Sequence, residues 1–193
     1  MRKLLIATNN SGKFNEIRAI LNNIPYKLVS LLKAGITEEI PETGRTFEEN
    51  AVQKARYVGE KTGLLTLADD SGLEVDYLDG RPGVRSARYV SGSDEDRVNQ
   101  VLRELKEVPI EKRGAKFVAV VALFDPKTKV IKTFRGESLG RITEMAVGKG
   151  GFGYDPIFYN FDLGKTNAQA SSSEKNNVSH RARALIKAKK YLE

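Results

Sequence analysis

The stretch AKFVAVVALF, from Ala115 to Phe124, decides the fold of this chain. Its almost unbroken apolar run predicts a central strand buried on both faces. Lys129 to Gly136 alternates between apolar and polar residues, and Asp125-Pro-Lys-Thr lies between the two segments, so we expect a hairpin. Other strands are predicted at Lys3 to Thr8, Tyr26 to Leu31 and Leu64 to Ala68, with a strand and turn from Gly72 to Gly80.

Helices are expected between these strands. Thr46-x-x-Glu49 is a capping box and predicts a helix to about Lys61. Asp94 to Glu107 has its apolar residues on one face. Further helices are predicted at Lys13 to Leu21 and Val178 to Leu192. The mixture predicts a single α/β domain over residues 1–193, with a mixed central sheet and flanking helices.

Composition excludes several classes of protein. The 193 residues contain no cysteine, which excludes a disulfide scaffold, a zinc ribbon and a thiol nucleophile. The one histidine, His180, rules out a multi-histidine metal site. The eight-residue apolar stretch from Phe117 to Phe124 is far shorter than a membrane span, and the N-terminal apolar run is too short for a signal peptide. We therefore expect a soluble cytoplasmic protein whose net charge of +7 attracts phosphate.

Two basic positions are candidates for binding phosphate. Thr8-Asn-Asn-Ser-Gly-Lys13 joins the first strand to a helix, and backbone N–H groups at a helix start favour an anion. An ordinary polar turn would have the same composition. Lys54 falls on or beside the apolar stripe of its helix, so it must be paired, reach out to solvent or face an anion-binding pocket.

Carboxylates follow the apolar strand that ends at Ala68. Asp69 and Asp70 should point in opposite directions if the strand continues, so at most one faces a given pocket. Glu42 is a possible second carboxylate, and such oxygen ligands suit Mg²⁺ bound to phosphate. The same Asp-Asp-Ser-Gly residues are also common turn formers, so a metal site and a simple turn both remain open.

The C-terminal third combines aromatic, glycine and hydrogen-bond donor residues. Phe152 and Tyr154 stand among glycines, where a ring can lie against a planar base. Lys175, His180 and Arg181 supply donors near a predicted helix start, and donors can bind carbonyl oxygens on the edge of a base. A polar residue at the start of a helix is the plainer interpretation of His180.

Six motifs in this order resemble the inosine/xanthosine triphosphate pyrophosphatase family over nearly the whole chain. They are Thr8 to Lys13 with Glu16, Phe47-Glu-Glu-Asn-Ala-x-x-Lys-Ala55, Ala68-Asp-Asp-Ser-Gly-Leu73, Pro82-Gly-Val-x-Ser-Ala-Arg88, Gly151-Phe-Gly-Tyr-Asp-Pro-x-Phe158 and Glu174-Lys-Asn-x-x-Ser-His-Arg181. The resemblance implies hydrolysis of deaminated purine nucleoside triphosphates to the monophosphate and pyrophosphate. It also implies an elongated mixed α/β fold with two lobes around a substrate cleft, dependence on Mg²⁺, and a homodimer.

The resemblance also assigns roles to individual residues. Asp70 matches the catalytic acidic residue, and Glu42 and Asp70 match the metal carboxylates. The positions that match the substrate-binding residues are Thr8, Asn9, Asn10, Ser11, Gly12, Lys13, Lys54, Ser71, Phe152, Gly153, Tyr154, Asp155, Lys175, His180 and Arg181. The chain departs from the family at Asn9, where many members have glycine, and at Ala168-Gln-Ala170, where Ala-Glu-Leu is frequent.

Two other functions are compatible with the sequence. A nucleotide pyrophosphatase that acts on modified pyrimidine or methylated triphosphates would carry the same phosphate chemistry. The positive charge also allows a nucleic-acid-binding module, but basic and acidic residues alternate through most of the chain, which disfavours it. We therefore expect a small-molecule triphosphate as the partner, and neither nucleic acid nor a membrane.

Overall fold

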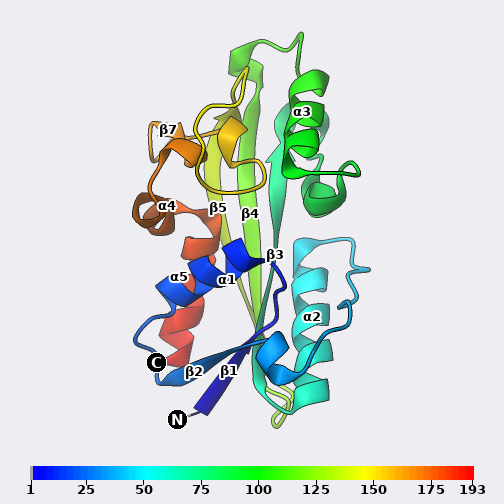
Figure 1. Cartoon of the computed structure of the whole chain (residues 1–193), viewed down its shortest axis with the longest axis vertical. Helices are drawn as coiled ribbons and strands as arrows, with labels where there is room; N and C mark the ends of the chain where they lie inside the picture. Colours follow the sequence, from blue (N-terminus) through cyan, green and yellow to red (C-terminus); the bar gives the residue numbers. More distant parts are fainter. Residues whose placement is uncertain (1) are drawn as a thin grey trace. The chain divides into compact units, whose positions relative to one another are not determined.

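The computed structural model describes residues 2–193, whose strands form a mixed seven-stranded sheet. The strand order is β2-β1-β3-β4-β5-β6-β7 (Figure 1). β1 pairs in parallel with β2 and β3, whereas β6 pairs antiparallel with β5 and β7. The bounds are β1 Arg2–Ile6, β2 Tyr26–Ser30, β3 Leu65–Val75, β4 Gly114–Phe124, β5 Ile131–Ile142, β6 Phe158–Asn160 and β7 Lys165–Thr166. The expected α/β fold with a mixed sheet is confirmed.

The helices begin where the sequence supplies capping side chains. Asn10 accepts a hydrogen bond from the Lys13 N–H and Thr46 accepts one from the Glu49 N–H. Glu49 itself accepts from the Arg45 N–H, one residue before the capping position. The bounds are α1 Ser11–Ile20, α2 Phe47–Thr62, α3 Asp94–Glu104, α4 Ser172–Val178 and α5 His180–Leu192. None of the helices among residues 2–193 combines the length and apolar character needed to span a bilayer.

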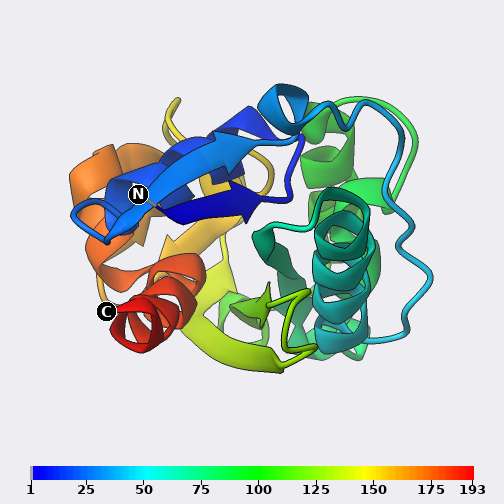
Figure 2. The same ribbon diagram turned by 90° about the horizontal axis from the view of Figure 1, so that it is seen from below.

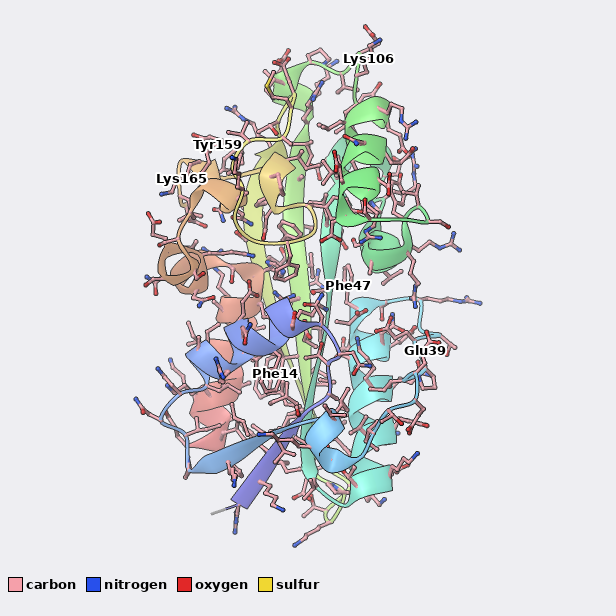
Figure 3. All side chains as sticks on the ribbon, in the orientation of Figure 1. Phe14, Glu39, Phe47, Lys106, Tyr159 and Lys165 are labelled. Atoms are coloured by element: carbon pink, nitrogen blue, oxygen red, sulfur yellow. The ribbon has the colours of Figure 1, made fainter. Side chains whose placement is uncertain are left out.

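The chain divides into two compact units, each with its own core. The first unit comprises the chain up to Asp70 together with Ala119–Gly136 and Arg181–Glu193. Its core brings together side chains of β1, β3, β4, α1 and α5, and Phe14 of α1 packs against it (Figure 3). α2 and α5 lie on opposite sides of the strands of this unit (Figures 1 and 2).

The second unit comprises Ser71–Val118 and Glu137–His180. Its core is built from apolar residues of β3, α3, β4 and the segment around β6. Buried Arg113 connects three parts of this unit, because its guanidinium donates to the carbonyl oxygens of Leu105, Val108 and Thr143. β3, β4 and β5 each contribute residues to both units.

Several boundaries differ from those expected. β3 continues without a break from Leu65 to Val75, so the interpretation of Asp69 to Gly72 as a turn is wrong. β5 runs on to Ile142 rather than ending at Gly136. The helix expected from Val178 begins two residues later as α5, because Ser179 has an extended backbone (φ −65°, ψ 154°), and the short helix α4 before it was not predicted.

Candidate functional site

The turn between β1 and α1 has the form expected of an anion-binding helix start. The Thr8 hydroxyl accepts from the Asn10 N–H at 3.2 Å, and the Asn10 side chain accepts from the Lys13 N–H at 2.9 Å. The N–H groups of Ser11 and Gly12 lie in the first turn, where no helical carbonyl is available to them. These donors and the helix dipole favour a negatively charged ligand at this position.

Asp69 lies between two cations and is fully buried. Its Oδ2 atom is 3.2 Å from Lys13 Nζ and 3.0 Å from Arg181 Nε, and Arg181 is also paired with Glu16. Burial alone would raise the pKa of Asp69, but Lys13 and Arg181 outweigh it and hold the pKa well below its usual range. Asp69 therefore remains a carboxylate that fixes the position of both basic groups.

Asp70 points to the other face of β3, toward α2. Lys54 Nζ lies 3.2 Å from Asp70 Oδ1 and 2.7 Å from Glu42 Oε1, and Asn50 Nδ2 donates to Asp70 Oδ2 at 3.0 Å. Burial raises the pKa of Asp70, and this effect is larger than the opposing effect of Lys54. The pKa of Lys54 is raised, because the neighbouring carboxylates outweigh its burial. The two consecutive aspartates thus lie on opposite faces with opposite pKa shifts, as strand alternation predicts.

Glu42 and Asp70 suit a hard divalent cation. Their carboxylates converge on one positive charge, the Lys54 ammonium, from two separate segments of the chain. Among residues 2–193, no group of three or more acidic or histidine side chains is arranged to hold a metal. Two carboxylates completed by phosphate oxygens and water are a typical environment for Mg²⁺. These residues therefore fit Mg²⁺, whose remaining ligands are water molecules or phosphate oxygens.

The second unit holds a separate cluster around Asp155. This buried carboxylate accepts from Lys175 Nζ at 2.5 Å, from the Phe152 N–H at 2.9 Å and from Asn167 Nδ2 at 3.1 Å. Lys175 Nζ also lies 4.6 Å from the centre of the Phe152 ring. Asp155 thus fixes both the glycine-rich loop and the lysine.

The two rings expected to stack on a base differ in environment. Tyr154 is only 4% exposed, packs in the core of the second unit, and donates its hydroxyl to the Ser86 carbonyl at 2.9 Å. Phe152 is partly exposed. The imidazole of His180 is buried and stacks on Phe117, with ring centres 4.7 Å apart and 11° between planes. A stacking role therefore fits Phe152 better than Tyr154.

The expected site residues divide between the two units. The first unit contains the Thr8 to Lys13 turn, Glu42, Lys54, Asp70 and Arg181, and the second contains Ser71, Phe152 to Asp155, Lys175 and His180. Arg181 directs its guanidinium to Asp69 and Glu16. A hollow of about 770 Å³ in the first unit, near Arg2, Tyr26 and Lys132, is lined by none of the expected residues.

Sequence reasoning assigned no role to Glu16 or Asn50, although both lie within the quoted motifs, and it did not predict that Asp69 serves as a counterion. Asn50 lies four residues before Lys54 and therefore on the same face of α2, a spacing that could have identified it. At the two departures from the family, Asn9 is exposed, and Gln169 accepts from the Thr166 N–H at 3.0 Å to cap a short 3₁₀ turn.

These features define an α/β protein with a mixed sheet, a basic helix start and two acidic side chains directed at one cation. Residues 4–191 match the Ham1 family, and the chain belongs to this family. This confirms the resemblance identified from the six motifs.

Individual relatives are similar over nearly their full length. A dITP/XTP pyrophosphatase of Symbiobacterium thermophilum is 49% identical, with 96% of this chain and 92% of the relative covered. A dITP/XTP pyrophosphatase of Bacillus subtilis is 48% identical, with 100% and 98% covered. The solved structure of a HAM1 protein from Coxiella burnetii has a TM-score of 0.90 at 37% identity, covering 100% of this chain and 98% of that chain.

Proposed function

We propose that this protein hydrolyses deaminated purine nucleoside triphosphates (ITP, dITP and XTP) to the monophosphate and pyrophosphate, which removes them from the nucleotide pool. The observation that carries the proposal is the convergence of Glu42 and Asp70 on one positive charge in the unit that also contains the basic start of α1. The relatives named dITP/XTP pyrophosphatase, similar over nearly all of the chain, support the choice of substrate.

Basic groups of the first unit bind the triphosphate. Lys13, Lys54 and the N–H groups of Ser11 and Gly12 are positioned to compensate its negative charge, which increases on the leaving pyrophosphate during the reaction. Burial lowers the pKa of Lys13, and Asp69 opposes this effect. Asp69 therefore helps to keep the lysine positively charged for the ligand.

Asp70 serves as the proton acceptor. Mg²⁺ held by Glu42 and Asp70 would neutralise phosphate charge and make a bound water more acidic. The oxygen of a water molecule forms a bond to the α-phosphorus, the bond from that phosphorus to the bridging oxygen breaks, and pyrophosphate leaves. The proton of the water passes to the Asp70 carboxylate.

Lys175 and His180 match the family's residues around the base and sugar. Hypoxanthine and xanthine carry a carbonyl at C6 where adenine has an amino group, so donors such as Lys175 and His180 favour the deaminated bases. Each donor that adenine leaves unpaired weakens binding by about 1–3 kcal/mol. Several such donors together discriminate strongly between adenine and the deaminated bases. We also propose that the protein requires Mg²⁺ and forms a homodimer, as the resemblance implies, and that it acts in the cytoplasm.

A substrate panel tests this function. Pyrophosphate release is followed with Mg²⁺ and ITP, dITP, XTP, the ordinary triphosphates, and modified pyrimidine and methylated triphosphates. We expect the deaminated purines to have the highest kcat/KM. Inosine and xanthosine triphosphates that react no faster than the ordinary four would refute the proposed substrate class.

Replacement of the proton acceptor gives a second test. Asp70→Asn should lower kcat by at least about 10²–10⁴-fold and leave the protein folded, because Lys54 keeps Glu42 as its partner. Asp79→Asn is the matched control, since Asp79 is exposed and its positive φ of 52° suits asparagine. Near-normal turnover of Asp70→Asn would contradict the assignment.

A further inference from the structure

Asn50 uses both ends of its side-chain amide and is only 1% exposed. Its Nδ2 atom donates to Asp70 Oδ2 at 3.0 Å. Its Oδ1 atom accepts from the Gly44 N–H at 2.8 Å. One side chain near the start of α2 therefore joins a carboxylate on β3 to the loop that precedes the helix.

This loop carries Glu42, two residues before Gly44. The backbone at Gly44 approaches α2 so closely that a Cβ atom there would lie 2.6 Å from Glu49 Cβ and 2.7 Å from Asn50 Oδ1. Glycine is thus required for the close approach that the Asn50 bond depends on. Asn50 consequently fixes the loop within two residues of Glu42 while it also fixes Asp70.

The chemistry of both contacts requires a side-chain amide. Asp70 Oδ2 needs a donor and the Gly44 N–H needs an acceptor, and asparagine offers both on one short planar group. Leucine has a similar size but makes neither bond, and alanine removes the group altogether.

We propose that Asn50 is a positioning residue that sets the separation and orientation of Glu42 and Asp70 for their divalent cation. The inference rests on the proposed function, because it takes Glu42 and Asp70 as the metal carboxylates. Asn50 does not touch the substrate in this scheme and acts only through the two acidic residues. Loss of a side chain that orients metal ligands typically lowers metal affinity or activity by about 10–100-fold.

Gln53 provides a matched comparison on the same helix. Its Oε1 atom accepts from the Thr43 N–H at 3.0 Å, and its Nε2 atom donates to the Thr43 hydroxyl at 3.0 Å. Gln53 therefore fastens the same loop, while Asn50 fastens both the loop and Asp70. A difference in Mn²⁺ binding or kcat between a variant of Asn50 and a variant of Gln53 therefore reports on the contact between Asn50 and the Asp70 carboxylate.

The experiment compares Asn50→Leu, Asn50→Ala and Gln53→Ala with the wild type. Mn²⁺ binding without nucleotide is measured by electron paramagnetic resonance and calorimetry. The kinetic measurements use the best substrate of the panel and give kcat, KM and the Mg²⁺ concentration for half-maximal activity. Melting curves identify variants that fail to fold, and Asn50→Ala decides the outcome if Asn50→Leu does not fold.

We expect both Asn50 variants to weaken Mn²⁺ binding and lower kcat by about 10–100-fold, with KM changed by less than about threefold. Gln53→Ala should remain within about threefold of the wild type in Mn²⁺ binding and kcat. Folded Asn50 variants with unchanged Mn²⁺ binding and kcat would overturn the inference. It would also be overturned if Gln53→Ala lost as much Mn²⁺ affinity and kcat as the Asn50 variants, or if the wild type bound no Mn²⁺. Failure of the proposed function would give a different result, namely a wild type that releases no pyrophosphate. The Mn²⁺ measurements would still compare the Asn50 variants with Gln53→Ala in that case.

Discussion

Asp69→Asn should strongly destabilise the protein at neutral pH. The substitution keeps the shape of the side chain and removes its charge, which leaves Lys13 and Arg181 without their shared buried counterion. Glu16 continues to compensate part of the Arg181 charge. The structure therefore predicts a loss of stability that comes from electrostatics, with no cavity introduced.

The two distances set the size of the effect. Asp69 Oδ2 lies 3.2 Å from Lys13 Nζ and 3.0 Å from Arg181 Nε. At an effective dielectric constant of about 20, each pair has an attraction of about 5 kcal/mol, which desolvation partly offsets. Removing one partner of a buried ion pair costs about 3–5 kcal/mol. For a chain of this length, that corresponds to a Tm lowered by roughly 6–20 °C.

The loss should depend on pH in a defined direction. The pKa of Asp69 is lower in the folded protein than in the unfolded chain, because Lys13 and Arg181 stabilise the carboxylate. Its contribution to stability is therefore complete above the unfolded pKa of about 4 and disappears as the pH falls through the lower folded value. The Tm difference between wild type and variant should be largest near pH 7 and smaller at pH 3.

The assay is thermal and urea-induced unfolding of both proteins at pH 7 and pH 3. Lys61→Met is the matched control, because Lys61 forms an ion pair with Glu38 at the surface, where its loss should hardly move the Tm. The reasoning is refuted if Asp69→Asn costs less than about 1 kcal/mol at pH 7, well below the range for a buried pair. It is also refuted if the Tm difference is the same at both pH values.

Two further outcomes follow from packing. Gly59→Ala should lower the free energy of unfolding in urea by about 1–3 kcal/mol, because the new Cβ atom would lie 2.6 Å from Phe124 Cδ1. An unchanged urea midpoint would show instead that the Phe124 ring moves freely. Tyr154→Phe should lower the free energy of unfolding by about 1–3 kcal/mol, because the Ser86 carbonyl loses its hydrogen bond, and it should leave KM unchanged. Phe152→Ala should raise KM, because stacking on the base contributes about 1–3 kcal/mol to binding. A raised KM for Tyr154→Phe with unchanged stability would reverse these two roles.

Local rules predicted the elements whose ends depend on nearby residues. Thr46 caps α2, so the start of this helix follows from a short sequence pattern, whereas α1 begins at Ser11, two residues before the expected Lys13, because Asn10 caps it. The apolar run of β4 likewise needs no distant partner to be recognised.

Features that depend on distant residues were not predictable in this way. Asp69 to Gly72 has the composition of a turn, and its strand conformation is supported by ion pairs such as that between Asp69 and Arg181, far apart in the chain. The role of Asn50 depends on the close approach of Gly44 to α2, which no periodicity indicates. Local propensity was outweighed where charged groups found partners on other elements.

The contrast between Asp69 and Asp70 shows how one strand gives neighbouring, identical residues different chemistry. The two-residue period of β3 turns Asp69 toward the cations of α1 and α5 and Asp70 toward α2. On the first face, the surrounding positive charge lowers the pKa and keeps a permanent counterion. On the second face, burial raises the pKa. Because a shift of one residue would exchange the faces, the register of β3 is itself a requirement of the site.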